Sequence, residues 1–199
     1  MLLALLVVAS SLCAGTSQAA VVPQVDSSGI LTGATGVLVN GQSYDVSFMD
    51  GTCAALFSGC DAASDFTFQS QVDAQAAALA LDAQVFVSTF DTNPNLTRDC
   101  PVGANCFAFT PFAVVAGTFP LVTTFSLPNS LASSDCCFTL GNVSVNDDQS
   151  FSSTTFTSTW AVWSTPVPEP SSYALLAVGL AALGWAHRRR CVGVAAHAQ

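Results

Sequence analysis

The chain has 199 residues, of which 51% are hydrophobic and only 9% are charged, and its formal net charge is −9. Residues 20–164 hold twelve Asp, no Glu, no Lys and one cation, Arg98, so twelve negative charges and one positive charge give −11 there. This apolar content excludes a disordered chain, and the negative charge argues against nucleic acid as a partner because phosphates would be repelled. Between targeting segments at the two ends, about 145 residues remain, which is enough for one folded domain.

Residues 1–19 have the pattern of a secretory signal peptide. Residues 2–9 form an apolar core, and residues 17–19, Ser-Gln-Ala, offer the small side chains that signal peptidase recognises. The basic region that normally precedes such a core is missing, since only the α-amino group is positive there. We expect the secretion machinery and signal peptidase as partners, with cleavage after Ala19.

The exported part opens with a predicted β-hairpin, residues 36–39 and 42–48. Asn40-Gly41 between them is the pair that best tolerates the positive φ angles of a type I′ turn. Apolar and polar side chains alternate along the second strand, which indicates one buried face and one exposed face. The buried set is Tyr44, Val46 and Phe48, and the exposed set is Ser43, Asp45 and Ser47. Residues 65–69 repeat the alternation through Phe66 and Phe68 and are predicted as another strand.

One soluble helix is predicted, at about residues 71–86. Ser70, with Asp73 three residues later, has the signature of a capping box. The helix carries a stripe of mostly small apolar residues suited to close packing on a sheet: Ala74, Ala78, Leu81 and Val85.

The rest of the exported part reads as strands and turns. Strands are predicted at about residues 106–115, 120–127, 137–145 and 151–163, and on the last one Phe156, Ser158, Trp160 and Val162 share a face. Runs of strands with a single helix predict a mainly β or α+β domain over residues 20–164. We expect an antiparallel sheet or a sandwich with one packed amphipathic helix.

Six of the eight cysteines fall in the exported part: Cys53, Cys60, Cys100, Cys106, Cys136 and Cys137. An even number in an exported chain favours disulfides, and the first two pairs are close enough in sequence to close small loops. The adjacent Cys136 and Cys137 would bond each other only in a strained ring, or would each reach elsewhere, and six cysteines allow fifteen pairings. No Cys-x-x-Cys spacing and no His occur in residues 20–164, so no metal site and no cofactor are predicted.

The missing residue types exclude most catalytic systems. Both histidines, His187 and His197, lie at or beyond the C-terminal apolar run, and residues 20–164 contain no Lys. Nucleophile–histidine systems and lysine Schiff bases are therefore excluded from the exported domain. Catalysis by two carboxylates is the surviving alternative, with Asp45, Asp50 and Asp65 as candidates, although most Asp residues read as turn and surface residues.

Two weaker motifs occur in the exported part. Residues 91–99, starting Asp-Thr-Asn-Pro-Asn, resemble half of a calcium loop, but Leu96 replaces the glycine and Val102 the acidic twelfth residue, which favours a plain turn. The second is a polar row on the last strand, with side chains about 6.7 Å apart: Ser153, Thr155, Thr157 and Thr159. Such a row suits ordered water, but one row is no repeat array, so it predicts no ice-binding function.

The C-terminus has three parts in order. Prolines 166, 168 and 170 stiffen a spacer, and residues 173–186 form an uncharged apolar run before Arg188, Arg189 and Arg190. With its flanks the run gives about 17 helical residues, roughly 26 Å, at the short end of what crosses a bilayer. The arginines place that side in the cytoplasm and the preceding domain outside the inner membrane.

This order of parts resembles the PEP-CTERM protein-sorting signal of Gram-negative bacteria, which is also labelled an ice-binding protein C-terminal domain. The likeness rests on Pro168, Glu169 and Pro170, on the arginines, and on a membrane span with Tyr173, Leu175, Leu176, Gly179, Leu180, Leu183 and Trp185. It implies that an exosortase, a membrane protease and transpeptidase, recognises Pro-Glu-Pro in this chain as its substrate. The tail 191–199 departs from the family, whose members usually end soon after the arginines.

A second resemblance concerns residues 40–60 with the Ala-rich helix, and Trp160-Ala-Val-Trp163 before the prolines. These are similar to a domain that recurs ahead of PEP-CTERM signals. That likeness supports the architecture and implies no chemistry.

The sequence as a whole predicts a non-catalytic exported protein. We expect it to be held briefly in the inner membrane by its C-terminal helix and then sorted to the cell surface, envelope or extracellular matrix. The PEP-CTERM resemblance implies an exopolysaccharide-producing setting, with exopolysaccharide as a possible partner. The alternatives are a secreted carboxylate-dependent hydrolase and a permanently membrane-anchored surface protein.

Overall fold

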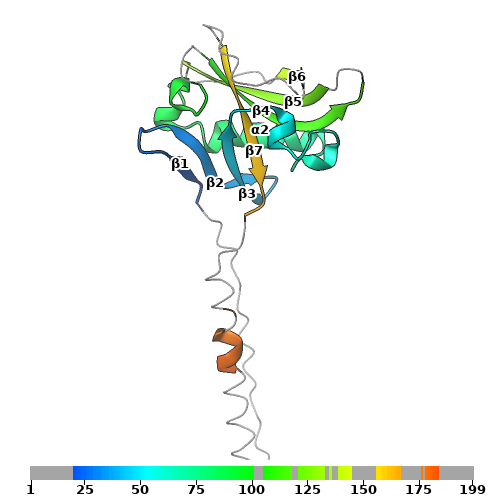
Figure 1. The fold of residues 1–199 in the computed structure, drawn as a ribbon. Helices are drawn as coiled ribbons and strands as arrows, with labels where there is room; N and C mark the ends of the chain where they lie inside the picture. The colour runs from blue at the N-terminus through cyan, green and yellow to red at the C-terminus, as the bar shows by residue number, and fades with distance from the viewer. Residues whose placement is uncertain are drawn as a thin grey trace, which may run out of the picture.

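The structure, a computed structural model, describes residues 20–100, 105–117, 121–132, 135, 139–144, 156–166, 176 and 178–183. The signal peptide predicted at residues 1–19 lies outside them. A seven-stranded sheet forms the centre of the described domain, in the order β1-β2-β3-β7-β4-β5-β6 (Figure 1). Its strands are β1 (Val22–Val25), β2 (Leu31–Val39), β3 (Gln42–Met49), β4 (Asn105–Val115), β5 (Leu121–Ser130), β6 (Thr139–Ser144) and β7 (Phe156–Ser164).

The prediction of a mainly β domain is confirmed, and the strand pairing is more complex than expected. Every neighbouring pair of strands is antiparallel except β4 and β7, which run parallel. The seven strands belong to one mixed sheet, so the described residues form neither a purely antiparallel sheet nor a sandwich of two sheets. The parallel pair arises because the last strand, β7, inserts between β3 and β4.

The predicted hairpin is present as β2 and β3. Asn40 and Gly41 have φ angles of 50° and 79°, as a type I′ turn requires, and Val39 pairs with Gln42 across the turn. Val46 and Phe48 are buried as predicted, and Tyr44 is half-buried with its ring 5.0 Å from that of Phe68. The local sequence therefore determines both the turn and the buried face.

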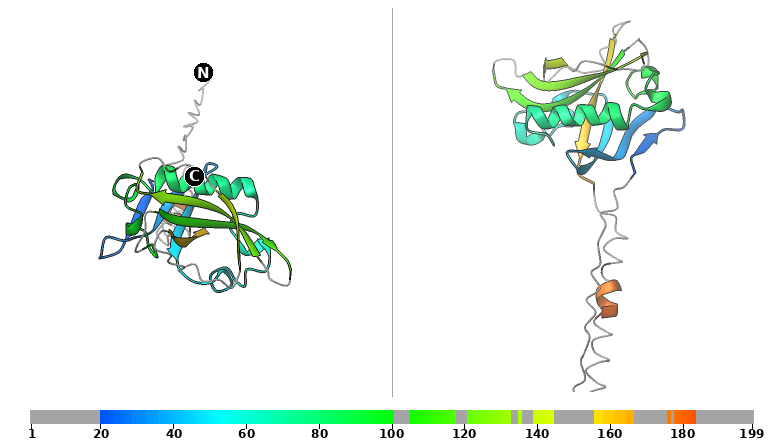
Figure 2. Two further views of the ribbon diagram at one scale, coloured as in Figure 1. Left: turned by 90° about the horizontal axis from the view of Figure 1, so that it is seen from above. Right: turned by 180° about the vertical axis from the view of Figure 1, so that it is seen from behind.

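The predicted helix is α2 (Gln71–Gln84), and it lies across one face of the sheet (Figure 2). The Ser70 hydroxyl caps it by accepting from the Asp73 backbone N–H, and it donates to the Asp73 carboxylate at 2.7 Å. The predicted stripe of Ala74, Ala78, Leu81 and Val85 is fully buried. The helix contacts β2, β4 and β5, which its length of roughly 21 Å allows, since β2 and β5 are about 19 Å apart across four strand spacings.

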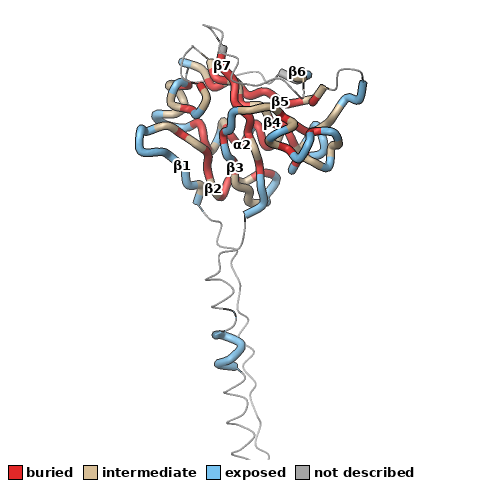
Figure 3. The backbone as a smooth tube through the Cα atoms, in the orientation of Figure 1, coloured by how far each residue is buried: buried red, intermediate tan, exposed pale blue. Residues whose placement is uncertain are grey.

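Both faces of the sheet are covered around β7 (Figure 3). Ala161 and Trp163 face the larger cluster beneath α2, while Trp160 and Val162 face a smaller one on the other side. The smaller cluster holds the Cys53–Cys60 loop, which includes the short helix α1 (Cys53–Leu56). This loop covers the face of the sheet that a second sheet would cover in a sandwich. Trp160 and Val162 share a face as predicted, and the side chain of Phe156 lies outside the described residues.

The prediction of a strand at residues 65–69 is wrong. Asp65 ends a 3-10 turn, η1 (Ala63–Asp65), and residues 66–69 are irregular, although Phe66 and Phe68 are buried as their alternation indicated. Two further 3-10 turns, η2 (Ser88–Phe90) and η3 (Pro94–Leu96), follow α2. Strand β1 was not predicted, because its four residues are all exposed and give no burial pattern to recognise.

The acidic residues at the two ends of α2 lie in opposite electrostatic environments. Asp73 lies in the first turn, where the helix dipole favours a negative charge, and its carboxylate also accepts a bond from Asn40 at 3.1 Å. Asp82 lies in the last turn, where the dipole opposes it. Partial burial and the nearby charges of Asp135 and Asp91 raise the pKa of Asp82 above its usual value.

Gly33 is a position where a side chain cannot be added. A Cβ there would lie 2.2 Å from the carbonyl oxygen of Val46 in the paired strand. We predict that Gly33→Ala lowers the free energy of unfolding by at least about 2 kcal/mol, measured by urea denaturation, because the β2–β3 ladder must shift. Gly141→Ala in β6 is the control, since its Cβ would meet only side-chain oxygens at 3.8 Å. Equal stability of the two variants would contradict the close approach.

Replacing Asp82 should stabilise the protein in a pH-dependent way. A carboxyl group whose folded pKa is raised costs stability at neutral pH, and this cost disappears as the pH falls through its pKa and the folded protein takes up the proton. We therefore expect Asp82→Asn to raise the urea midpoint at pH 7 and to have little effect well below pH 4. Asp73→Asn on the same helix should lower the midpoint, and a lowered midpoint for both would refute this account.

Candidate functional site

The two chain segments that lead to the predicted targeting sequences leave the domain at the same end. The strand register pairs Val22 with Thr35 and Asp45 with Ser164. The β2 bulge between Ala34 and Val37 faces Asp45, so these four residues lie in about one row across β1, β2, β3 and β7. Three strand spacings separate the first from the last, about 14 Å. We call this row the anchor end of the domain; in Figure 1 it is the lower end, to which β7 points.

The last residues of β7 are held in place at the anchor end by side-chain contacts. The Trp163 ring lies against Phe68 at 5.4 Å and donates from its indole nitrogen to the Thr110 hydroxyl at 3.2 Å. The Thr67 hydroxyl donates to the Trp163 carbonyl. Ser164 still pairs with Asp45 of β3, and beyond it Thr165 and Pro166 are exposed. The folded sheet therefore ends at Ser164, and the spacer starts at once.

The predicted recognition residues follow the sheet after a short connection. Pro168, Glu169 and Pro170 lie outside the described residues. Three residues, 165–167, separate them in the sequence from Ser164, where β7 ends.

Part of the predicted membrane segment is described. Residues 178–183 are helical, as is Leu176, and the large side chains there are 61–69% exposed: Leu176, Val178, Leu180 and Leu183. Within the described stretches, no helix has the length and apolar content needed to cross a bilayer. Other predicted residues of the span and its stop lie outside the description: Tyr173, Leu175, Trp185, Arg188, Arg189 and Arg190. Gly179 has open space around it.

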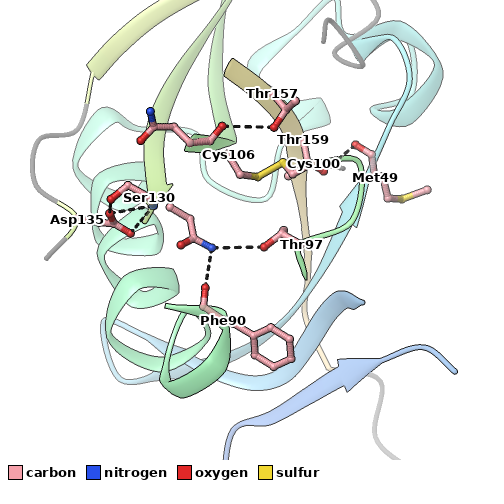
Figure 4. Close-up of a disulfide and its surroundings, with 11 residues drawn as sticks. Met49, Phe90, Thr97, Cys100, Cys106, Ser130, Asp135, Thr157 and Thr159 are labelled. Atoms are coloured by element: carbon pink, nitrogen blue, oxygen red, sulfur yellow. Dashed lines mark hydrogen bonds between the residues drawn. A yellow bond between two sulfur atoms is a disulfide. The ribbon is translucent and has the colours of Figure 1, made fainter. Parts of the chain in front are cut away.

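Among the described residues there are two disulfides, Cys53–Cys60 and Cys100–Cys106, and they are the two local pairs that the spacing favoured. All four cysteines are buried. The second bridge ties the start of β4 to the segment after Asp99 (Figure 4). Cys136 and Cys137 lie outside the described residues. Among the residues that are described, no group of His, Cys, Asp or Glu is arranged to hold a metal ion.

The three carboxylates named for a hydrolase are not brought together as a set. Five residues along β3 separate Asp45 from Asp50, roughly 17 Å, whereas paired catalytic carboxylates stand about 5–9.5 Å apart. Each of the three accepts backbone N–H bonds in a turn or bulge. The donors are Gly36 to Asp45 at 3.1 Å, Gly51 to Asp50 at 2.8 Å, and Asp61 and Ala62 to Asp65 at 3.0 and 3.1 Å.

The two weaker motifs are structural. Residues 91–99 form turns, in which the Asn93 amide donates to the Thr89 carbonyl at 2.7 Å. Thr157 and Thr159 are buried, and their hydroxyls donate to the carbonyls of Asn105 and Met49. These two threonines therefore offer no exposed row to ordered water, and Ser153 and Thr155 lie outside the described residues.

Comparisons with known proteins agree with the sequence at the C-terminus. The family model of the PEP-CTERM protein-sorting motif matches residues 166–190, directly after the exposed end of β7. No curated protein and no solved structure matches this chain. The motif implies export and handling by exosortase-type membrane machinery on the way to the cell surface. The chain is a protein that carries a PEP-CTERM sorting motif at its C-terminus.

Proposed function

We propose that this protein is a non-catalytic component of the cell envelope or extracellular matrix, delivered by an exosortase that recognises Pro168, Glu169 and Pro170. The observation that supports the proposal most is where the motif starts. It begins at residue 166, two residues after the last sheet pair, at the end of the domain where β1 also begins. From the resemblance to its family, we propose an exopolysaccharide-rich matrix as its setting.

The geometry of the anchor end suits a domain that has one membrane segment before it in the sequence and another after it. During export the signal peptide would lie in the membrane just before β1, and later the C-terminal segment would lie there just after β7. Since the two attachment points are about 14 Å apart in one row of the sheet, the folded domain can stand on the bilayer in one orientation throughout.

Two further observations support the proposal. Buried disulfides are typical of proteins that fold outside the reducing cytoplasm. The hydrolase alternative is less well supported, because the candidate carboxylates Asp45 and Asp50 are too far apart to act on one bond. The remaining alternative, permanent anchoring, differs from sorting in one measurable property, which is the mass of the mature C-terminus.

We predict that the mature protein from the native cell surface lacks Gln199 and ends near Pro170, as shown by mass spectrometry of its C-terminal peptide. Glu169→Gln should reduce this processing at least about tenfold, because it removes the one charge in the recognised segment. The unprocessed chain should then accumulate in the membrane fraction.

Pro166→Ala is the matched control for this experiment. It changes a proline of the same spacer but leaves the three recognised residues intact, so processing should continue. A wild-type chain that remains in membranes with Gln199 intact would refute sorting and establish permanent anchoring.

The length of the connection should also limit processing. Deleting residues 165–167 would attach Pro168 directly to Ser164, which pairs with β3, and the sheet would then block access to the recognised segment. We expect the processed fraction to fall at least about tenfold in pulse-chase labelling. Inserting Gly-Ser-Gly after Thr165 lengthens the connection and should leave processing unchanged. Normal processing of the deletion variant would show that the enzyme does not need a free segment.

A further inference from the structure

A pocket of about 220 Å³ opens at the end of the domain opposite the anchor end. Phe48, Met49, Asp50, Arg98 and Asp99 line it. Met49 pairs with Trp160, four positions along β7 from Ser164, and Asp50 follows where β3 ends. If the anchor end faces the membrane, this pocket faces outward.

Two buried side chains of β7 form hydrogen bonds that hold the pocket wall made by the residues at the end of β3. The Thr159 hydroxyl donates to the Met49 carbonyl at 3.3 Å, and the Trp160 indole nitrogen donates to the Gly51 carbonyl at 2.9 Å. Thr159 and Trp160 are both fully buried. The backbone on either side of Asp50 is therefore held in place.

The opposite wall is fixed on both sides of Arg98. The Arg98 backbone N–H donates to the Leu31 carbonyl at 2.9 Å, and Thr97 is fully buried, with its hydroxyl accepting from the Asn129 amide at 3.4 Å. The Cys100–Cys106 disulfide follows directly (Figure 4). A pocket whose two walls are held in this way loses little entropy when it binds a ligand.

The lining carries both signs of charge. Arg98, the only cation in residues 20–164, is exposed, and it lies in the lining with Asp50 and Asp99, whose carboxylates disfavour an anion. A neutral ligand that presents hydroxyl groups suits such a lining, because a hydroxyl can donate to a carboxylate and accept from a guanidinium. Met49, 39% exposed, adds an apolar surface for the C–H groups of such a ligand.

The volume limits the ligand to one ring. Pockets that hold drug-sized molecules measure about 300–1,000 Å³, and this pocket is smaller. Adjacent hydroxyl groups on a small ring with an apolar C–H face describe a monosaccharide. We propose that the pocket binds one neutral sugar ring, free or at the end of a glycan. This inference is independent of sorting, since sugar binding could fail while processing at Pro-Glu-Pro proceeds.

Met49 provides a direct probe, because the full chain contains only two methionines, Met1 and Met49. We would label the full-length protein with [¹³C-methyl]methionine, hold it in detergent micelles, and assign the Met49 signal by its loss in Met49→Leu. Titration with glucose, galactose and mannose should shift this signal for at least one of the three sugars. The affinity should be millimolar, as expected for one exposed ring.

Variants and charged analogues complete the experiment. Arg98→Gln and Asp50→Asn should each weaken binding at least about tenfold, whereas Asp61→Asn, which alters an exposed carboxylate outside the pocket, should not. Unchanged thermal unfolding of the variants would show that the loss is local. No Met49 shift with any of the three sugars at about 100 mM would overturn the proposal. A shift with glucosamine or glucuronate alone would also overturn it, since the pocket would then select a charged ligand.

Discussion

The insertion of β7 between β3 and β4 is the constraint on which the rest of the structure depends. Without β7 the sheet separates into β1-β2-β3 and β4-β5-β6, since no other strand pair joins the two groups among the described residues. β7 also supplies both hydrophobic clusters, with Trp163 on one face and Trp160 on the other. Strand pairing, the packing beneath α2 and the second layer formed by the Cys53–Cys60 loop therefore all require the last strand before the sorting motif. The chain finishes its fold at the point where its sorting signal begins.

This position has consequences for an exported protein. Segments cross the membrane in chain order, so the two groups of strands can form early but can join only when residue 164 has crossed. Each of the two described disulfides closes within one local segment and does not depend on that step. The two attachments that we propose also differ. The predicted signal peptide is followed by β1, an exposed edge strand of four residues, whereas the predicted membrane segment follows a strand that is paired on both sides and buried on both faces. The proposed C-terminal attachment is thus made through the strand with the more extensive pairing and packing.

Local features of the fold were predictable, and long-range ones were not. Asn40-Gly41, the cap at Ser70 and the stripe on α2 carry their signals within a few residues, and the structure has them as predicted. Residues 65–69 alternate like a strand, but they lie against Trp163 and Phe57 as an irregular segment, so alternation predicted burial and not pairing.

The parallel β4–β7 pair joins residues about 50 positions apart, which no local pattern encodes. The pocket was missed for the same reason, because residues 48–50 and 98–99, which line it, are about 50 positions apart in the sequence. Arg98, the one cation of the domain, was the available signal.

The sheet also separates the two activities that we propose. β3 and β7 run from the anchor end to the end that carries the pocket, and they are paired along this whole length. The pairing holds β3 and β7 together over this length, so the direction of the pocket is set by the attachment of Ser164. Removal of everything after Pro170 would leave each sheet pair, each described disulfide and the pocket lining untouched, since all of them precede residue 165. A domain built in this way keeps its fold and its outward-facing pocket whether it is still anchored or already released, which is what delivery by a cleaving enzyme requires of its cargo.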